Sequence, residues 1–249
     1  MQDDLAERKG TQPEARTRGT AEPVEESLAG KADSDRDIQH LIVVGHPSAD
    51  SFCHSIAHAY ATAVAEYGQR SVTRDLYAIG FDPLLKADER PDTARFHLSP
   101  DVETELSFVR ASRSITLVYP IWFGMPPAII KGYVDRVLGA GLSIKAVRGN
   151  KRQEALSGKQ FVLLTTSGAS LPWLAERGLW YSLREAFDYY LEGTLGFASS
   201  EHEHFGSIVS PLSPDYAAEC LTRAEERARM ICSVLHNTAH REQMARLRK

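Results

Sequence analysis

The sequence predicts an α/β fold: a five-stranded, doubly wound parallel sheet with helices on both of its faces. Three short apolar runs rich in β-branched residues, at 40–45, 114–119 and 160–165, are typical of strands buried on both sides. Segments with helical spacing alternate with the strands, and this alternation implies right-handed crossovers between parallel strands. At 43% hydrophobic and 25% charged residues, the 249-residue chain has the composition of a globular protein.

The first half of the pattern starts with the earliest of these strands. After it we expect a helix at 52–68, a strand at 70–77, a loop with short helical turns at 81–99 and a helix at 99–111. Apolar and alanine positions at Phe52, Ile56 and Ala59 recur at helical spacing. Ser99 is a candidate N-cap for the later helix, with Pro100 in its first turn.

The second half continues the alternation. In order, we expect a strand at 114–119, a helix at 126–138, a loop at 139–158, a strand at 160–165, a helix at 177–192, a strand within 197–209 and a helix at 213–236. Pro126 and Pro127 suit the first turn of their helix, because proline lacks the N–H that would be unpaired there. The arginine-rich remainder, 237–249, is expected to be a frayed basic tail.

The formal charge of −4 lies entirely in residues 1–37, which hold ten acidic and six basic residues. This segment has no aromatic residue and no periodicity, so we expect a disordered extension ahead of one domain at 38–236. The segment lacks the apolar core of a secretory signal, and no apolar run reaches the roughly 18 residues of a membrane span. Three cysteines without metal-ligand spacing indicate a reducing, cytoplasmic setting, and the neutral body argues against a nucleic-acid partner.

Three loops follow three of the predicted strands and should meet at one edge of the sheet. The first, Gly45-His-Pro-Ser-Ala-Asp-Ser51, ends at a helix N-terminus, where backbone N–H groups favour a phosphate. An equally weighted alternative is that Ser51 or Asp50 simply caps that helix. The third loop, Thr165-Thr-Ser-Gly-Ala-Ser170, can present consecutive N–H groups to an anionic or carbonyl edge, although alone it is a generic turn.

The second loop, Tyr119-Pro-Ile-Trp-Phe-Gly124, is the most informative. Trp122 and Phe123 at a strand end suit a flat ring that must be stacked and shielded from water. Gly124 would let the backbone approach the edge of such a ring. The alternative is a hydrophobic plug between the loop and the next helix. Together the three loops offer what a flavin mononucleotide requires: a phosphate site, an aromatic wall and a polar wall.

On these residues the chain resembles the flavodoxin-like family of NAD(P)H quinone reductases, FMN azoreductases and related flavin oxidoreductases. The resemblance covers roughly residues 40–210 and is carried by three motifs in matching order. They are His46-Pro-Ser-Ala-Asp-Ser-Phe-Cys-His54, then Tyr119-Pro-Ile-Trp-Phe-Gly-Met-Pro-Pro-Ala128 with Lys131-Gly-Tyr-Val-Asp-Arg-Val137, then Thr165-Thr-Ser-Gly168. The resemblance implies a flavodoxin-like fold and homodimers with a flavin at each interfacial site. It also implies ping-pong two-electron transfer, with NAD(P)H as a transient donor.

The same resemblance implies which residues hold the cofactor. The phosphate-bearing tail falls beside His46, Ser51, Phe52 and Cys53; the isoalloxazine beside Pro120, Ile121, Trp122, Phe123 and Gly124; its pyrimidine side beside Thr165, Thr166, Ser167 and Gly168. The compact phosphate loop favours FMN, with FAD as the alternative. Because the flavin carries the hydride chemistry, no catalytic side chain is assigned. Cys53 has two interpretations, a redox-active thiol or simple packing beside the cofactor.

The chain departs from the mammalian-type quinone reductases after the third loop. Those enzymes carry a Tyr and a His there, whereas this chain has Ala169-Ser-Leu-Pro-Trp-Leu-Ala-Glu-Arg-Gly178. Trp173 either shapes the substrate pocket or packs in a dimer interface. His202 and His204 share one strand face, but a metal site would need a third ligand. A half-exposed strand is therefore the preferred interpretation, and no metal is expected.

The predicted function is an NAD(P)H-dependent flavin oxidoreductase that reduces quinones or similar small-molecule electron acceptors. A first alternative is a flavin-binding regulatory or electron-carrier protein without turnover of its own, as in ancillary subunits of potassium efflux systems. A second is a family member that has lost its flavin. Since every loop assigned to chemistry lies after residue 45, residues 1–37 are predicted to be dispensable for flavin binding.

Overall fold

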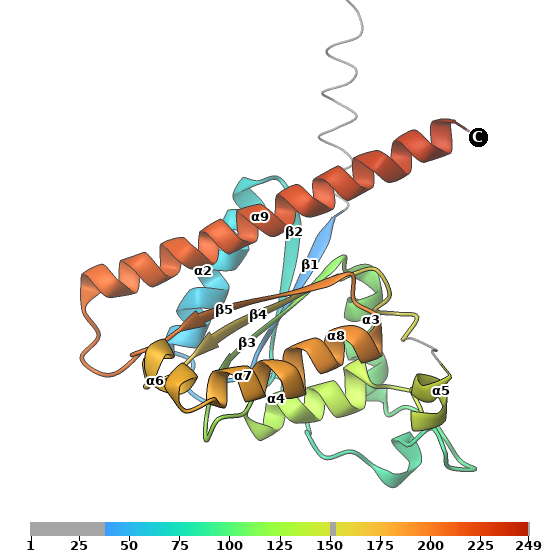
Figure 1. Cartoon of the computed structure of the whole chain (residues 1–249). Helices are drawn as coiled ribbons and strands as arrows, with labels where there is room; N and C mark the ends of the chain where they lie inside the picture. The colour runs from blue at the N-terminus through green and yellow to red at the C-terminus, as the bar shows by residue number, and fades with distance from the viewer. Residues whose placement is uncertain (1–37, 150–152, 249) are drawn as a thin grey trace, which may run out of the picture.

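A computed structural model describes residues 38–149 and 153–248, and the extension predicted at 1–37 lies outside these ranges. Within them, five parallel strands form one sheet in the order β2-β1-β3-β4-β5 (Figure 1). The strands are β1 (Gln39–Val44), β2 (Arg70–Asp75), β3 (Ser114–Pro120), β4 (Gln160–Thr166) and β5 (Ser199–Phe205). This order is the doubly wound arrangement of flavodoxin-like proteins, and it confirms the predicted fold class.

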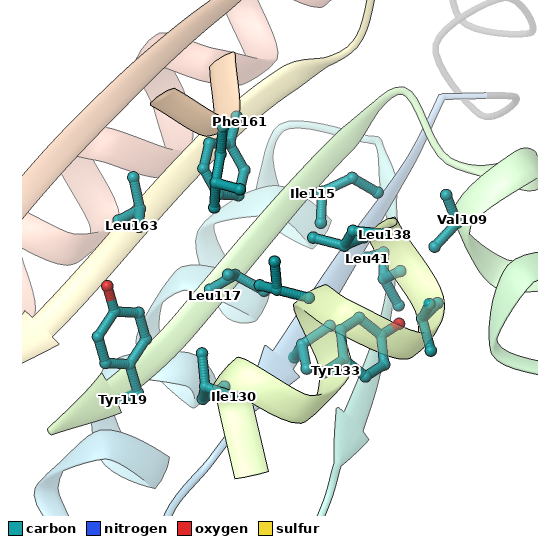
Figure 2. Packing of buried hydrophobic residues seen from close by; sticks show 14 of the residues in the cluster. Leu41, Val109, Ile115, Leu117, Tyr119, Ile130, Tyr133, Leu138, Phe161 and Leu163 are labelled. Atoms are coloured by element: carbon teal, nitrogen blue, oxygen red, sulfur yellow. The ribbon is translucent and has the colours of Figure 1, made fainter. Parts of the chain in front are cut away.

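Helices cover both faces of the sheet (Figure 1). One face carries α2 (Phe52–Glu66) and α9 (Pro214–Leu247), which pack against each other and the sheet. The other carries α3 (Pro100–Ala111), α4 (Ala128–Tyr133) and the one-turn π-helix η2 (Val134–Leu138). On that face Leu117, Phe161 and Leu163 of the sheet belong to the same buried cluster as Ile130 and Tyr133 of α4 (Figure 2).

The central strands are buried on both faces, as predicted. Alternate residues of β1 enter opposite layers: Leu41 and Val43 join the core under α4, and Ile42 and Val44 join the core under α2. This division explains the continuous apolar run in the sequence, because a strand covered on both sides has no solvent-facing position. All seven residues of β3 are buried.

The structure has two short helices that the sequence did not predict. The helix expected at 177–192 is present as one continuous helical stretch, formed by α7 (Leu179–Leu183), the π-helix η3 (Arg184–Tyr189) and α8 (Tyr190–Leu195). A short helix, α6 (Leu171–Glu176), precedes it. Gly178, at φ +70° in the left-handed region that favours glycine, separates α6 from α7. A short helix, α5 (Ile144–Arg148), also lies inside the loop expected at 139–158.

The final helix is longer than predicted. Helix α9 continues to Leu247, so the expectation of a frayed tail after residue 236 is wrong for residues 237–247. Eight of the eleven residues 237–247 are alanine, arginine, glutamate, glutamine, methionine or leucine, which are strong helix formers. An ion pair between Arg113 and Glu242, with 3.1 Å from Nη1 to Oε2, also ties the extension to the start of β3. High charge density was therefore a misleading sign of disorder here.

The segment expected as a loop at 81–99 is held in place by a buried ion network and contains one helical turn, η1 (Ala87–Glu89). Arg136 of η2 places Nη2 2.6 Å from Glu89 Oε1 and Nη1 2.7 Å from Asp101 Oδ2. Ser99 occupies the N-cap position of α3 as predicted, but its hydroxyl donates to Glu89 Oε1 instead of capping the helix. The segment thus packs against the helix that follows the aromatic loop.

Candidate functional site

The three predicted loops meet at the carboxyl edge of the sheet and line one cavity of about 150 Å³. They meet because β1, β3 and β4 are adjacent and parallel, so their carboxyl ends lie side by side. The lining residues are His46, Ser51, Phe52, Cys53, Pro120, Ile121, Trp122, Thr166, Ser167, Gly168 and Ile208. Ten of the thirteen residues expected to hold a cofactor are in this set, and Phe123, Gly124 and Thr165 are not.

The first loop supplies a neutral imidazole. His46 Nδ1 lies 3.0 Å from the Ser48 backbone nitrogen and 3.2 Å from the Ser48 carbonyl oxygen, so it accepts from the N–H when the ring proton is on Nε2 and donates to the carbonyl when Nδ1 is protonated. Burial and the nearby His54 lower the pKa of His46 below its usual 6.5, against a hydrogen bond to Ser48 that raises it. The His46 ring also lies 5.7 Å from the ring of Trp122, which joins the first loop to the second.

The first turn of α2 has no side-chain cap. Ser51 is the N-cap residue, but its Oγ lies 2.8 Å from His54 Nδ1, and His54 Nε2 lies 3.0 Å from Asp75 Oδ2. Partial burial alone would raise the pKa of Asp75, and the hydrogen bonds from His54 and two backbone amides lower it overall. The capping interpretation of Ser51 is therefore not supported, and the leading amides of α2 remain available to an anion at the cavity.

The second loop is a tight turn that presents its aromatic residues outward. Trp122 and Met125 exchange backbone hydrogen bonds of 3.1 Å in both directions, and the two residues between them have positive φ: Phe123 at +52° and Gly124 at +81°. A bulky residue in that region costs about 1–2 kcal/mol. The Phe123 side chain is fully exposed and Trp122 is 42% exposed. The alternative of a hydrophobic plug is not supported, because these rings do not fill a core.

The third loop divides its side chains between the cavity and the interior. Thr166 Oγ1 lies 3.4 Å from Cys53 Sγ at the floor of the cavity. Thr165 is fully buried on the opposite side of β4, where its hydroxyl meets two histidines, so its side chain does not face the cavity. Ser167 and Gly168 form the wall. Trp173, expected in the substrate pocket, lies half-exposed on α6 beneath the Arg177 guanidinium and does not line the cavity.

One lining residue, Ile208, was missed from the sequence. The chain after β5 continues alongside the third loop: the N–H of Ser207 donates to the Ala169 carbonyl at 3.0 Å, and that of Ile208 to the Ser167 carbonyl at 2.9 Å. These bonds bring Ile208 over the cavity. The available signal was an apolar pair, Ile208-Val209, directly after the fifth strand.

Cys53, His202 and His204 were the other candidates for redox or metal chemistry. Burial, the largest effect, raises the pKa of Cys53 to about 11, against a hydrogen bond with Thr166 that lowers it. A thiol of that pKa is not a ready redox group, which favours simple packing. Within residues 38–149 and 153–248, no group of three metal-ligating side chains converges. Strand β5 is half-exposed over its first five residues, as expected, but the side chains of His202 and His204 are buried.

The curated relatives of this chain are named as NAD(P)H-dependent oxidoreductases. It is 34% identical over 172 residues to an uncharacterized NAD(P)H oxidoreductase from Haemophilus influenzae, across 69% of this chain and 85% of that protein. It is 30% identical over 147 residues to the rat NAD(P)H dehydrogenase [quinone] 1, across 52% of this chain and 53% of the rat enzyme. The chain therefore matches only about half the length of the rat enzyme.

Solved structures share the fold at lower identity. An NAD(P)H:quinone oxidoreductase from Methanothermobacter marburgensis superposes with a TM-score of 0.66 at 22% identity, covering 78% of this chain and 98% of that one. An FMN-dependent NADH-azoreductase from Bacillus anthracis, solved with FMN, gives a TM-score of 0.56 at 14% identity, covering 80% and 99%. A sequence model of the flavodoxin-like fold matches residues 39–229. The chain thus belongs to the flavodoxin-like fold family and is a homologue of NAD(P)H:quinone oxidoreductases.

Proposed function

We propose that this protein is an NAD(P)H-dependent flavin oxidoreductase that binds FMN and reduces quinones or similar acceptors by two electrons. The observation that carries the proposal is the single cavity in which an uncapped helix N-terminus, an indole and a Thr-Ser-Gly loop converge. These are donors for a phosphate, a surface for a flat ring and donors for the polar edge of that ring. The residues present therefore fit a flavin mononucleotide.

Each wall of the cavity would contact a different part of the flavin mononucleotide. The leading amides of α2, with the Nε2–H of His46, would bind the phosphate, and His46 would do so as a neutral donor. Trp122 and Ile121 would orient and shield the ring, while Ser167 and Gly168 would meet its pyrimidine edge. A bound flavin supplies the hydride chemistry. The nicotinamide donor and the acceptor would then occupy the open side of the ring in turn.

A second copy of the chain would complete the site. The rings of Phe123 and Trp122 are exposed next to the cavity, and exposed aromatic groups of this kind are typical of interfaces. A homodimer is therefore part of the proposal. Sedimentation of the purified protein measures it, and a monomer at micromolar concentration would refute this part.

The first test is the absorbance spectrum of the purified full chain after incubation with FMN or FAD, followed by mass identification of the flavin retained. We expect FMN to be retained, and a protein that takes up neither flavin would refute the proposal. Steady-state oxidation of NADH and NADPH is then measured with a panel of quinones and azo dyes.

A regulatory or electron-carrier role is the second candidate. The observation that favours it is the absence, from residues 169–178, of the Tyr and His of mammalian-type quinone reductases. Retained flavin without turnover toward any acceptor in the panel would support this role over the enzyme.

A further inference from the structure

A chain of four hydrogen bonds runs from a buried carboxylate to the wall of the cavity. Asp188 Oδ2 lies 2.6 Å from His202 Nδ1, and His202 Nε2 lies 2.7 Å from Thr165 Oγ1. The same Thr165 oxygen lies 2.9 Å from His204 Nδ1, and His204 Nε2 lies 3.0 Å from Ser167 Oγ. All five side chains are buried, and Ser167 alone among them lines the cavity.

The donor and acceptor of each of these hydrogen bonds can be assigned by starting from Ser167, which lines the cavity. Ser167 has one hydroxyl proton, which it donates to the Ala169 carbonyl at 2.7 Å. His204 Nε2 must then be the donor to Ser167, and with that proton on Nε2 the neutral ring accepts at Nδ1. Thr165 therefore donates to His204, so its oxygen accepts from His202 Nε2. Each donor along the chain points toward the cavity.

The inner end of the chain holds one further proton. With Nε2 of His202 already protonated, the 2.6 Å contact between its Nδ1 and Asp188 contains a proton on one side or the other. The pair is thus an imidazolium with a carboxylate, or a neutral imidazole with a carboxylic acid. In both forms the His202–Asp188 pair carries one proton that can be passed on, because the five side chains remain hydrogen-bonded to one another after it has left.

The surroundings keep the outer histidine neutral. Burial, the largest effect, with the charges of His202 and Arg223, lowers the pKa of His204 to about 4, against the nearby Glu203. The Trp180 ring covers both histidines, with centroids 4.6 Å from His202 and 5.2 Å from His204.

The other polar groups around the inner pair are Arg184 and Tyr119. Arg184 Nε lies 3.6 Å from Asp188 Oδ2. Burial, with the nearby Asp188 charge as a smaller effect, raises the pKa of the Tyr119 hydroxyl.

We propose that Asp188, His202, Thr165, His204 and Ser167 form a proton relay that donates one proton through the Ser167 hydroxyl to an acceptor molecule in the cavity. The proposal rests on the proposed function. Reduction of a quinone by NAD(P)H consumes one proton: NAD(P)H + H⁺ + quinone gives NAD(P)⁺ + hydroquinone. The hydride equivalent carries both electrons, and the relay supplies the proton to the second quinone oxygen.

The transfer is a sequence of short proton shifts. The Ser167 proton goes to the acceptor oxygen, the His204 Nε2 proton to Ser167, the Thr165 proton to His204 Nδ1 and the His202 Nε2 proton to Thr165. His202 is left neutral, with its Nδ1–H on the Asp188 carboxylate, and water in the emptied cavity restores the proton by the reverse route. The same directions argue against a hydrolytic serine, because His204 Nε2 already carries a proton and cannot act as a base toward Ser167.

The first experiment reads the relay without any flavin. In the full chain labelled with ¹⁵N-histidine, we expect His204 to be neutral at pH 7 with its proton on Nε2. We expect His202 to be protonated at Nε2, with a far-downfield proton between Nδ1 and Asp188. Thr165→Val should shift both histidine signals. A His204 ring protonated on Nδ1, or charged at pH 7, would overturn the relay.

The second experiment separates the two half-reactions in flavin-loaded protein. Thr165→Val should retain flavin affinity within twofold and the rate of reduction by NADH. Oxidation by benzoquinone should slow roughly 10²-fold, at the lower end of general-acid contributions, and lose its sensitivity to D₂O. If the valine variant folds poorly, His202→Gln, at a relay side chain that does not line the cavity, should likewise slow only the oxidation by benzoquinone. Thr116→Val, at a buried threonine of the neighbouring β3, is the matched control and should leave both rates unchanged.

The results separate this relay from the proposed function. Equal slowing of both half-reactions by Thr165→Val, or no slowing of either, would overturn the relay while leaving the flavoenzyme intact. If the wild-type protein takes up no flavin, the proposed function fails. In that case the ¹⁵N signals of His202 and His204 still test whether the hydrogen bonds from Asp188 to Ser167 have the inferred donors and acceptors.

Discussion

Replacing Glu89 by glutamine should destabilise the protein more than any exposed charge change. The Glu89 carboxylate is buried against Arg136, whose guanidinium lies 2.6 Å away, and it also accepts from the Ser99 hydroxyl. The hydrogen bond from Arg136, the largest effect, lowers the pKa of Glu89 from 4.5 to about 2, although burial opposes this shift. Glu89→Gln keeps the size of the side chain and leaves Arg136 buried with one less charged partner.

Two independent estimates give a similar loss of unfolding free energy for Glu89→Gln. A fall of the pKa from 4.5 to about 2 is worth about 3 kcal/mol, at 1.36 kcal/mol per unit. Removing one partner of a buried ion pair costs about 3–5 kcal/mol. Because the pKa is lower in the folded state, this stabilisation is complete above pH 4.5 and is lost as the pH falls toward 2. By the same relation, about 2 kcal/mol should remain at pH 3.5.

Urea unfolding of the two proteins measures this difference. At pH 7 we expect Glu89→Gln to lose about 3 kcal/mol of unfolding free energy, and the gap should narrow between pH 5 and pH 3.5. Asp135→Asn is the matched control, because its partner Lys131 is exposed on the neighbouring helix, and it should cost under about 0.5 kcal/mol. A loss below about 1 kcal/mol at pH 7, or a gap that does not change with pH, would refute this assignment of Glu89.

Three further predictions concern the cavity. Cys53, with a pKa of about 11, should resist iodoacetamide at pH 8 in the folded protein and react after unfolding; rapid labelling of the folded chain would contradict the buried position. Trp122→Ala should weaken flavin binding about tenfold, as measured by fluorescence quenching, whereas Trp173→Ala should change it less than twofold. An equal effect of the two would contradict the placement of Trp122 in the cavity wall. A chain starting at Asp37 should bind flavin as tightly as the full chain, and loss of flavin on truncation would show that residues 1–36 contribute to the site.

Much of the fold followed from periodicity, because strands covered on both faces leave continuous apolar runs. The meeting of three loops at one edge followed from parallel topology alone. Thr165 was wrongly expected beside the cofactor because residues 165–168 were all assigned to the same side of the cavity. Successive strand residues point to opposite faces, so Thr166 beside Cys53 requires Thr165 to face the other layer. That alternation was available in the sequence.

Other features depended on tertiary packing. His202 and His204 lie on the edge strand β5, and their alternation with glutamates is typical of a strand with one face in water. They are buried because Trp180 covers them. Trp180 lies on α7, and its contact with β5 depends on how that helix packs against the sheet. The burial of the two histidines was therefore not readable from the strand itself.

Ser167 belongs both to the wall of the cavity and to the hydrogen-bonded series of side chains behind it. Its backbone is held on both sides by the fifth strand and its continuation: its N–H donates to the Phe205 carbonyl at 3.0 Å, and its carbonyl accepts from Ile208. Gly206 lies close behind, where a Cβ would come within 2.9 Å of the Ala169 carbonyl oxygen that receives the Ser167 proton. The segment that places Ile208 over the cavity thus also sets the direction of the Ser167 hydroxyl. In the proposed relay the proton would therefore come from the strand behind the third loop, because Ser167 bonds to that strand through its backbone and to His204 through its hydroxyl.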